Sequence, residues 1–359
     1  MPTTLSEVYE DHPIHLQHIV PIDFSSAQTL PDSHAWSQSD GFSSGSSSVF
    51  PDTPADDSLF SIPLIDLMNP NASDLICQAC ESWGAFQLIG HGIPSKLIEE
   101  VDSESRRLFA LPSEQKLKTL RSPGGAAGYG IARISPFFPK YMWHEGFTIL
   151  GSSKDHAKEL WPHDYERFCE TMDEYQKQMK MISHKLIRMM LKHLNISEEE
   201  VKWIGSTTES TALQLNSYPA CPDPDRAMGL APHTDTSLMT LVHQSQISGL
   251  QIHKEGVGWV RVHPIYGALA INVGDLLHIL SNGRFPSALH RVTVNQTMQR
   301  FSVAYFYGPP VDFTVSPLLS KDVSGSGEVE APLYRSVTVK EYVGMKAKYL
   351  EKALSLLKN

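Results

Sequence analysis

The chain has 359 residues, of which 41% are hydrophobic and 19% charged, and its formal net charge is −10. This is the composition of a globular protein with a substantial core, and the negative charge repels phosphate backbones, so we expect no nucleic-acid partner. No stretch supplies the roughly 20 apolar residues of a membrane span, and the N-terminal sequence is not that of a secretory signal, so we expect a cytoplasmic protein without membrane contact.

The first part of the chain divides by composition. Residues 1–58 are rich in Ser, Asp, Gly and Pro, which predicts a flexible N-terminal segment. We expect order to begin near "SIPLIDL" at residues 61–67, followed by two helices split by a second strand, "AFQLIG", at residues 85–90. Cys77 and Cys80 form a CxxC in the first helical stretch, but no second CxxC completes a zinc site, so we predict buried, reduced thiols.

The next two stretches have different signatures. Residues 121–150 are rich in glycine and aromatic residues without helical or extended spacing, which is typical of a long loop that covers a pocket. Residues 165–194 carry apolar residues at alternating spacings of four and three, which predicts a long helix. We expect its apolar stripe to pack in the core rather than to form a Met-rich binding surface. The stripe consists of Phe168, Met172, Tyr175, Met179, Ile182, Leu186 and Met189.

From residue 211 to about 313 the apolar period changes to two. Short runs such as "LQLNSY", "SLMTLVH" and "RFSVAYFYG" alternate with turn residues, which predicts a β-sandwich or β-barrel. Near the C-terminus, Thr338 and Glu341 form the capping box of a final helix. We therefore predict a mainly β protein with flanking helices. Its expected regions are an N-terminal helix-and-strand region at 59–205, the β core at 206–315 and a C-terminal helical region at 316–359.

The motif "PHTDTS" at residues 232–237 is the first candidate site. In a strand, residues two apart point to the same face, so His233 and Asp235 would offer an imidazole nitrogen and a carboxylate oxygen to one point. Two histidines and one carboxylate on one face are the pattern of non-haem iron(II) oxygenases. A second pair is His253 and Glu255. The sequence "KEGVG" predicts a hairpin turn there, so we expect Glu255 to project into solvent.

The third ligand has several candidates downstream. Of these we favour His290, because "RFS" follows ten residues later and places Arg300 and Ser302 on one face of a strand. A guanidinium fork beside a hydroxyl suits the far carboxylate of a dicarboxylic acid. The other downstream histidines are His243, His253, His263 and His278. Taken singly, the His233–Asp235 pair could be a structural hydrogen bond, and Arg300 a salt-bridging residue.

The run "LQLNSY" supplies another polar face. Gln214, Asn216 and Tyr218 point one way, while Leu213 and Leu215 point the other. This alternation predicts a sheet with a polar, functional inner face and an apolar outer face covered by helices.

These segments resemble the plant 2-oxoglutarate- and iron(II)-dependent dioxygenases. The resemblance covers roughly residues 60–350 and lies in "IPLIDL…ACESWGAFQLIGHGIP" and in the run from "NSYPACPDPDRAMGLAPHTDTS" through "FPSALHRVTVN" to "RFSVAYFYGP". It implies a distorted double-stranded β-helix (jelly roll), isopenicillin N synthase-like, and an enzyme that uses Fe(II), 2-oxoglutarate, O2 and ascorbate. Nothing in the sequence suggests an obligate dimer, so we expect a monomer. The residues that it implies are the iron ligands His233, Asp235 and His290, the carboxylate-binding Arg300 and Ser302, and the neighbouring Tyr218 and Asn216.

Within that family the chain is most similar to the gibberellin 3-beta-dioxygenases, notably in "GYGIARISPFFPKYMWHEGFTI". This likeness implies 3β-hydroxylation of gibberellin precursors. The alternatives are 2β-hydroxylation of gibberellin or oxidation of another apolar terpenoid by the same mechanism. A metal-binding barrel without catalysis and a hormone receptor without iron are the readings outside the enzyme class. The candidate substrate-binding residues are Tyr129, Arg133, Phe137, Trp143 and Phe306, with Phe138, Phe147 and Lys140 as further parts of the same wall.

Overall fold

The strands of this protein form two large sheets that pack face to face. The computed structural model describes residues 4–37, 61–194, 196, 202–206, 208–319 and 331–359. The larger sheet contains, in spatial order, β1 (Leu64–Asp66), β2 (Ala85–Ile89), β10 (Leu269–Val273), β7 (Met239–Gln244), β12 (Arg300–Gly308), β5 (Ser210–Tyr218), β4 (Glu145–Ile149) and β3 (Gly128–Gly130). The smaller sheet contains β6 (Met228–His233), β11 (His290–Thr293), β8 (Leu250–Lys254) and β9 (Gly258–Arg261).

The larger sheet joins the N-terminal and C-terminal halves of the chain. Strand β4 pairs antiparallel with β5, so that Phe147 lies opposite Leu215. Strand β2 pairs in the same way with β10. The predicted boundary between residues 205 and 206 therefore runs through one continuous sheet. A short third sheet pairs β13 (Thr314–Val315) with β14 (Val337–Thr338).

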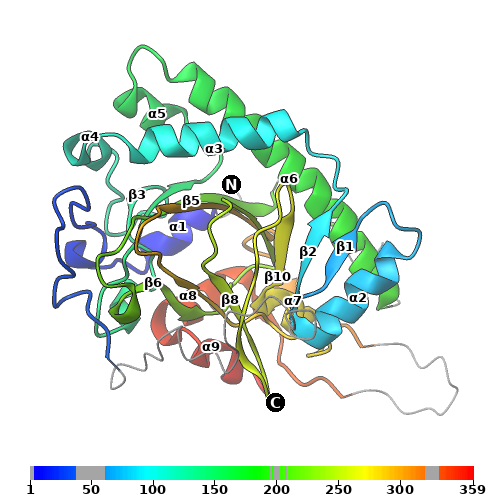
Figure 1. Cartoon of the computed structure of the whole chain (residues 1–359). Helices are drawn as coiled ribbons and strands as arrows, with labels where there is room; N and C mark the ends of the chain where they lie inside the picture. The colour runs from blue at the N-terminus through cyan, green and yellow to red at the C-terminus, as the bar shows by residue number, and fades with distance from the viewer. Residues whose placement is uncertain (1–3, 38–60, 195, 197–201, 207, 320–330) are drawn as a thin grey trace, which may run out of the picture.

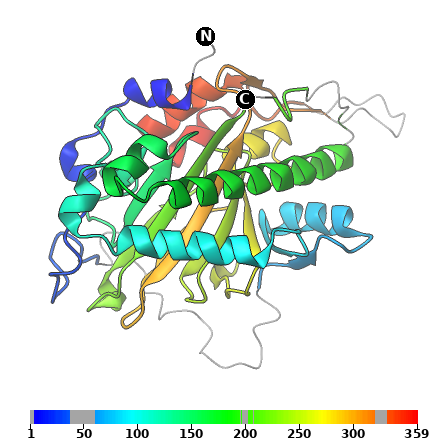
Figure 2. The same ribbon diagram turned by 90° about the horizontal axis from the view of Figure 1, so that it is seen from above.

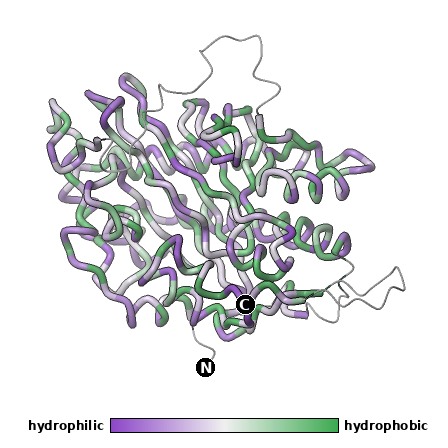
Figure 3. The backbone as a smooth tube through the Cα atoms, turned by 90° about the horizontal axis from the view of Figure 1, so that it is seen from below, coloured by the Kyte–Doolittle hydropathy of each residue, from purple (hydrophilic) through white to green (hydrophobic). Residues whose placement is uncertain are grey.

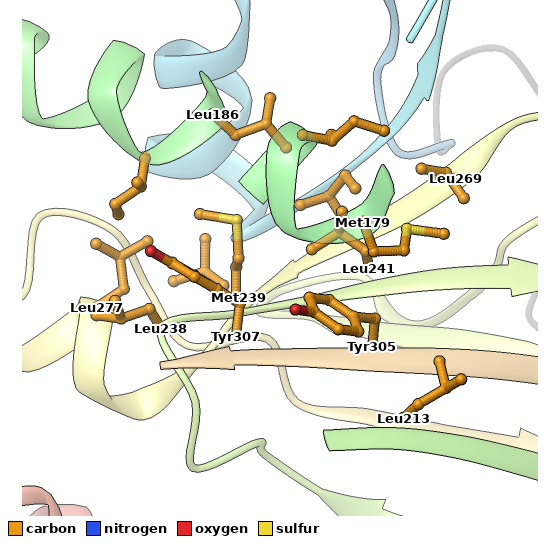
Figure 4. Packing of buried hydrophobic residues seen from close by; sticks show 14 of the residues in the cluster. Met179, Leu186, Leu213, Leu238, Met239, Leu241, Leu269, Leu277, Tyr305 and Tyr307 are labelled. Carbon is orange, nitrogen blue, oxygen red and sulfur yellow. The ribbon is translucent and has the colours of Figure 1, made fainter. Parts of the chain in front are cut away.

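The two faces of the larger sheet differ as their alternating sequence predicts. On β5, Leu213 and Leu215 belong to the main hydrophobic core, whereas Gln214 and Asn216 line an internal cavity. On β12, Tyr305 belongs to that core. Figure 4 shows the core side of the sheet, where labelled side chains from β7 and β12 meet those of a helix. One face of the sheet is thus closed by packing, and the other opens toward the smaller sheet.

Helices cover the outer face of the larger sheet. The N-terminal half supplies α2 (Ala72–Trp83), α3 (Ser95–Phe109), α4 (Ser113–Leu117), α5 (Lys154–Leu160) and α6 (Glu166–His193). Figure 2 shows α3 and α6 lying side by side along the sheet, and the two helices are in contact. Figure 3 shows hydrophobic and hydrophilic residues interleaved along the backbone tube. On α6 the buried residues recur at helical spacing, so one stripe of that helix faces the core. Among the described residues, no helix combines the length and the apolar character that crossing a membrane requires.

The long helix and the cysteines follow the sequence prediction. Helix α6 spans Glu166–His193, and its stripe is buried in the main core apart from Met189, which is partly buried against it. Cys77 and Cys80 are free thiols, fully buried on α2. Burial raises the pKa of Cys77 to about 12, which disfavours the thiolate, and the predicted burial of these thiols is confirmed.

The N-terminal segment is ordered where the sequence predicted flexibility. Residues 4–37 contain α1 (Leu5–Glu10) and a 3₁₀ turn at Leu16–His18, and they bury Val8, Ile19 and Trp36. The prediction of a flexible segment over residues 1–58 is therefore wrong for residues 4–37, while residues 1–3 and 38–58 lie outside the described residues. A few buried apolar side chains hold this polar stretch against the rest of the protein. The average composition of the stretch does not reveal these contacts.

The C-terminal helices lie against this N-terminal segment. Thr338 caps α8 (Val339–Tyr349) by accepting a hydrogen bond from the Glu341 backbone N–H, as the capping-box pattern predicts. The helix ends at Leu350, which has a positive φ of 44°, and α9 (Lys352–Ser355) follows. Helix α1 contacts α8, and Figure 1 shows both on the same side of the β core. Helices α1 and α8 therefore share one wall of the molecule.

The loop-like stretch at residues 121–150 contains more regular structure than its spacing suggests. It supplies β3 and β4 at the edge of the larger sheet, together with a 3₁₀ turn at Ser135–Phe137. Short edge strands with glycine at both ends, such as "GYG", carry too little alternation to be recognised from sequence. The remaining loop passes beside the cavity, as predicted.

Two methionines two residues apart on α6 test the packing of the helix. Met179 is fully buried, whereas Met181 is 58% exposed. Met179→Ala should lower the free energy of unfolding by about 2–4 kcal/mol, because it leaves a cavity against the sheet. Met181→Ala should change it by less than about 0.5 kcal/mol. Urea denaturation followed by circular dichroism measures both, and equal effects would contradict this packing.

Candidate active site

Two histidines from different strands form the base of the site. His233 is the last residue of β6 and His290 the first of β11, and the two lie opposite each other in the antiparallel pairing. Their ring centroids are 4.2 Å apart. The Nδ1 atom of His233 lies 2.8 Å from the Ala231 carbonyl, and that of His290 lies 3.0 Å from the Ala288 carbonyl. Each ring therefore donates through Nδ1, which leaves both Nε2 atoms as acceptors on the same side.

Asp235 completes the group, but not through strand periodicity. It lies two residues beyond the end of β6, in the connection to β7. The Thr240 hydroxyl donates to its Oδ2 at 2.6 Å, and the Asp275 backbone N–H donates to its carbonyl at 2.8 Å. Its Oδ1 lies 3.6 Å from His233 Nε2, and its Oδ2 lies 3.9 Å from His290 Nε2. The expected strand thus ends at His233 and does not extend to Asp235, and contacts from Thr240 on β7 and from the first residue of α7 orient the carboxylate.

The three side chains are suited to a metal ion. Their ligand atoms all lie within 4.8 Å of one another, and among the described residues this is the only such group of histidine, cysteine and acidic side chains. Burial, with His290 nearby, lowers the pKa of His233 to about 3. Burial alone raises the pKa of Asp235, but the two histidines and the Thr240 hydroxyl lower it overall. A neutral imidazole beside an ionised carboxylate is the protonation state that a divalent cation requires.

A buried hydrogen-bond network lies behind His233, Asp235 and His290, which we call the metal group. The sequence did not predict this network. Asp275, the first residue of α7 (Asp275–Leu280), accepts hydrogen bonds from Ser287 at 2.6 Å and from Tyr342 at 2.8 Å. Lys346 of α8 lies 3.0 Å from Asp275 and donates to the Thr234 hydroxyl at 2.9 Å. The C-terminal helix is thereby bonded to the loop between His233 and Asp235. Single charged residues in a helix give no sequence signal for such a role.

Arg300 lies buried at another part of the same cavity. Its Nη2 donates to Gln244 Oε1 at 2.9 Å, and its Nη1 lies 3.5 Å from Ser302 Oγ. Its Nε has no hydrogen-bond partner among the described residues, and no acidic side chain pairs with it there. A Cβ at Gly249 would lie 2.7 Å from Arg300 Cδ, so glycine leaves the space that the arginine occupies. A buried guanidinium without an anion is a receptor for a carboxylate.

The predicted partners of Arg300 adjoin it. The guanidinium lies over the Tyr218 ring at 5.1 Å. Asn216 Nδ2 lies 3.4 Å from Ser302 Oγ, and its Oδ1 lies 2.9 Å from His144 Nε2. The structure therefore brings Asn216, Tyr218, Arg300 and Ser302 together, as the sequence predicted. It adds Gln244, which orients Arg300, and His144, which orients Asn216; neither belongs to a recognisable pattern.

A cavity of about 850 Å³ connects these groups. Its wall includes the metal group, Arg300 and Ser302, and it is otherwise mainly apolar. Of the predicted substrate-binding residues, Arg133, Phe137 and Phe306 line it. Its volume falls within the range of small-molecule sites.

Two of the predicted substrate-binding residues lie elsewhere. Tyr129 is buried in the main core, where its hydroxyl donates to Glu145 at 2.5 Å. Trp143 is buried in a separate cluster, and its Nε1 donates to the Pro219 carbonyl at 3.0 Å. Neither is among the described residues that line the cavity. In an irregular stretch, aromatic residues serve the core and the cavity alike, and composition does not separate them.

The other candidates of the same wall also lie outside the cavity. Phe147 is fully buried in the main core, Phe138 packs in a small separate cluster, and half-buried Lys140 donates to the Asp32 carbonyl. The rival histidine His253 is exposed on β8, apart from the metal group.

The comparisons with family models agree with this arrangement. Residues 210–309 match the 2OG-Fe(II) oxygenase superfamily. Residues 62–165 match the N-terminal region described as non-haem dioxygenase in morphine synthesis. The crystal structure of JOX2 in complex with 2OG, Fe and JA superposes with a TM-score of 0.78 at 27% identity, covering 94% of this chain and 96% of that one. The predicted jelly-roll fold and the Fe(II)- and 2-oxoglutarate-dependent enzyme class are confirmed.

Curated relatives match over nearly the whole chain. Gibberellin 3-beta-dioxygenase 1 of Pisum sativum is 52% identical over 356 residues, covering 98% of this chain and 93% of the relative. Gibberellin 3-beta-dioxygenase 1 of Arabidopsis thaliana is 47% identical, covering 100% of this chain and 99% of the relative. With identities this high over more than nine tenths of each chain, the protein belongs to the gibberellin 3-beta-dioxygenases of the 2OG-Fe(II) oxygenase superfamily.

Proposed function

We propose that this chain hydroxylates gibberellin precursors at C3 on the β face, with iron(II) and 2-oxoglutarate. In this proposal His233, Asp235 and His290 are the iron ligands. The observation that carries it is the position of these ligand atoms, within 4.8 Å of one another, on the wall of a cavity. The same cavity also contains a buried arginine, Arg300, that has no acidic partner among the described residues. A site with this composition binds a metal, a carboxylate and an apolar molecule together.

Iron(II) bound there supplies the activation of O2, coupled to decarboxylation of 2-oxoglutarate to succinate and CO2. The protein's part is to place the two organic substrates. Arg300 and Ser302 bind the distal carboxylate of 2-oxoglutarate, and Gln244 and Tyr218 keep the guanidinium in place. Asn216, fixed by His144, lies beside them. Because these groups are buried, their interactions with charge are stronger than in water.

The apolar part of the cavity binds the terpenoid. Phe137 and Phe306 line it together with aliphatic side chains such as Leu230 and Val343. A rigid, mostly apolar diterpenoid is held there by burial of its surface, with polar groups to fix its orientation. The names of the relatives support attack at C3. Attack at C2 is the alternative, since a shift of one carbon requires only about 1.5 Å, a carbon–carbon bond length. The monomeric state and the cytoplasmic location stay predictions.

Product analysis tests the proposed reaction. Purified protein is incubated anaerobically with Fe(II), ascorbate and a labelled gibberellin precursor, and O2 is then admitted with and without 2-oxoglutarate. We expect a 3β-hydroxylated product in equal amount to succinate, identified by mass spectrometry. His233→Ala should abolish the product and lower the bound iron, because it removes a ligand.

The histidine of the rival pair provides the matched control. His253 is exposed and lies outside the metal group, so His253→Ala should keep the iron content and the product yield. A 2β product would keep the chemistry and change the position of attack. Succinate without a gibberellin product would reject the substrate.

The hydrogen bond from Arg300 to Gln244 gives a second test. Gln244→Leu keeps the size of the side chain and removes the acceptor that orients the guanidinium. We expect KM for 2-oxoglutarate to rise about 10-fold, in line with a charged hydrogen bond, while KM for gibberellin stays within about 2-fold. Steady-state assays that vary each substrate in turn give both values. Gln244→Glu should keep the bond to Arg300 but compete with the carboxylate, so it should weaken 2-oxoglutarate binding as well.

A matched pair on the other sheet controls for the loss of a buried hydrogen bond. Arg291 Nε donates to Gln251 Oε1 at 2.7 Å, and neither residue lines the cavity. Gln251→Leu should leave KM for 2-oxoglutarate unchanged. An equal rise in both variants would mean that Gln244 serves stability rather than binding.

A further inference from the structure

The structure contains a second buried guanidinium in the cavity, that of Arg121. We propose that Arg121 binds a carboxylate of the terpenoid substrate and so fixes its orientation relative to the metal group. This inference rests on the proposed function and adds to it a residue that determines specificity. The sequence instead pointed to Arg133 and Lys140 as the basic residues of the substrate-binding wall.

Arg121 is held in place by its backbone and by one side-chain bond. Its N–H donates to the Tyr129 carbonyl at 2.8 Å, next to the bridge between Leu120 and Tyr129. Its Nη2 donates to the Ile131 carbonyl at 2.7 Å. The side chain is 4% exposed and lines the cavity. Its Nε has no hydrogen-bond partner among the described residues. A rigidly held donor with an unused N–H thus borders the cavity.

Among the described residues, no acidic side chain pairs with Arg121 either. Among the described residues that line the cavity, the acidic ones are Asp11 and Asp235. Asp235 belongs to the metal group, and Asp11 lies 3.8 Å from Lys340 at the surface. Burial, with Arg133 nearby, lowers the pKa of Arg121 to about 10. Buried charges in proteins are normally paired, so a ligand anion is the missing partner.

Arg133 is less available than Arg121. One of its amino groups donates to the Gly125 carbonyl, and the other to the His12 carbonyl at 2.8 Å. Its guanidinium also lies 4.4 Å from the centre of the Tyr9 ring. Arg133 therefore fastens the N-terminal segment over the cavity and adds positive charge beside Arg121. Lys140 is outside the cavity, where it donates to the Asp32 carbonyl.

Arg121 gives the substrate carboxylate a binding position of its own, separate from the position of the 2-oxoglutarate carboxylate at Arg300. Arg121 is close enough to His144 to depress the pKa of that imidazole, which burial chiefly lowers to about 4. His144 in turn forms a hydrogen bond with Asn216, which adjoins Ser302, one of the residues proposed to bind 2-oxoglutarate. The cavity thus carries one buried guanidinium for each of two carboxylate-bearing substrates. A neutral His144 between them avoids a third charge.

The test compares a gibberellin precursor that has one free carboxylate with its methyl ester. Both are titrated anaerobically into the full chain loaded with Fe(II) and 2-oxoglutarate, and Kd is measured by calorimetry. Arg121→Met keeps the length of the side chain and removes the charge. We expect Kd for the acid to rise at least about 30-fold and Kd for the ester to change less than about 3-fold, because a charge-assisted bond is lost only by the acid. KM for 2-oxoglutarate should not change.

Two further variants control the result. Arg121→Lys keeps the charge without the fork and should give an intermediate preference for the acid; it also serves if Arg121→Met does not fold. Arg107→Met removes an arginine that is paired with Glu104 and Asp164 outside the cavity, and should leave the preference unchanged.

The outcomes separate the two proposals. Wild-type protein that makes the 3β product, with a preference for the acid that Arg121→Met leaves intact, would overturn the role of Arg121 and leave the proposed function standing. An equal rise in Kd for the acid and the ester would also overturn the role of Arg121. It would show that the substitution changes the shape of the cavity rather than the binding of a carboxylate. Wild-type protein that neither binds nor hydroxylates the precursor would overturn both proposals.

Discussion

Strands β6 and β11 are more than fifty residues apart in the sequence, yet their pairing places His233 directly opposite His290. The geometry of the whole metal group, His233, Asp235 and His290, depends on this register. A slip of one residue would turn one imidazole to the opposite face of the sheet. The backbone carbonyls that receive each Nδ1 proton come from the same two chain segments, so one pairing fixes the position and the tautomer of both rings.

Asp235 requires a different kind of support, because it lies beyond the strand. The Thr240 hydroxyl and the N-terminus of α7 hold it, and Lys346 on the C-terminal helix bonds to the loop that carries it. The metal group is therefore assembled from two strands, one loop and contacts from a distant helix. Such support from behind the ligands is what maintains their geometry when the metal is absent.

The interior contains positive charge that its own side chains do not neutralise. Arg300 and Arg121 are both buried, and among the described residues neither has an acidic partner. Burying such charges destabilises the fold, and the large hydrophobic core against the helices offsets that cost. The same desolvation makes each guanidinium a stronger receptor for an anionic substrate. The buried guanidinium groups thus lower the stability of the fold at the positions where they favour anion binding, as is common at functional sites.

Residue type predicted the chemistry of the three candidate metal ligands, and spacings of two within single segments predicted the alternation of the strands. The alternation correctly placed Gln214 and Asn216 on the cavity side and Leu213 and Leu215 on the core side. Features that depend on contacts between distant segments required the tertiary structure, beginning with the position of Asp235 beyond the end of β6. These features include the ordering of residues 4–37 over the cavity, the burial of Tyr129 and Trp143 away from the cavity, and the position of the buried Arg121 on the cavity wall. An aromatic or charged residue in an irregular stretch carries no periodicity, so its partners alone determine its role.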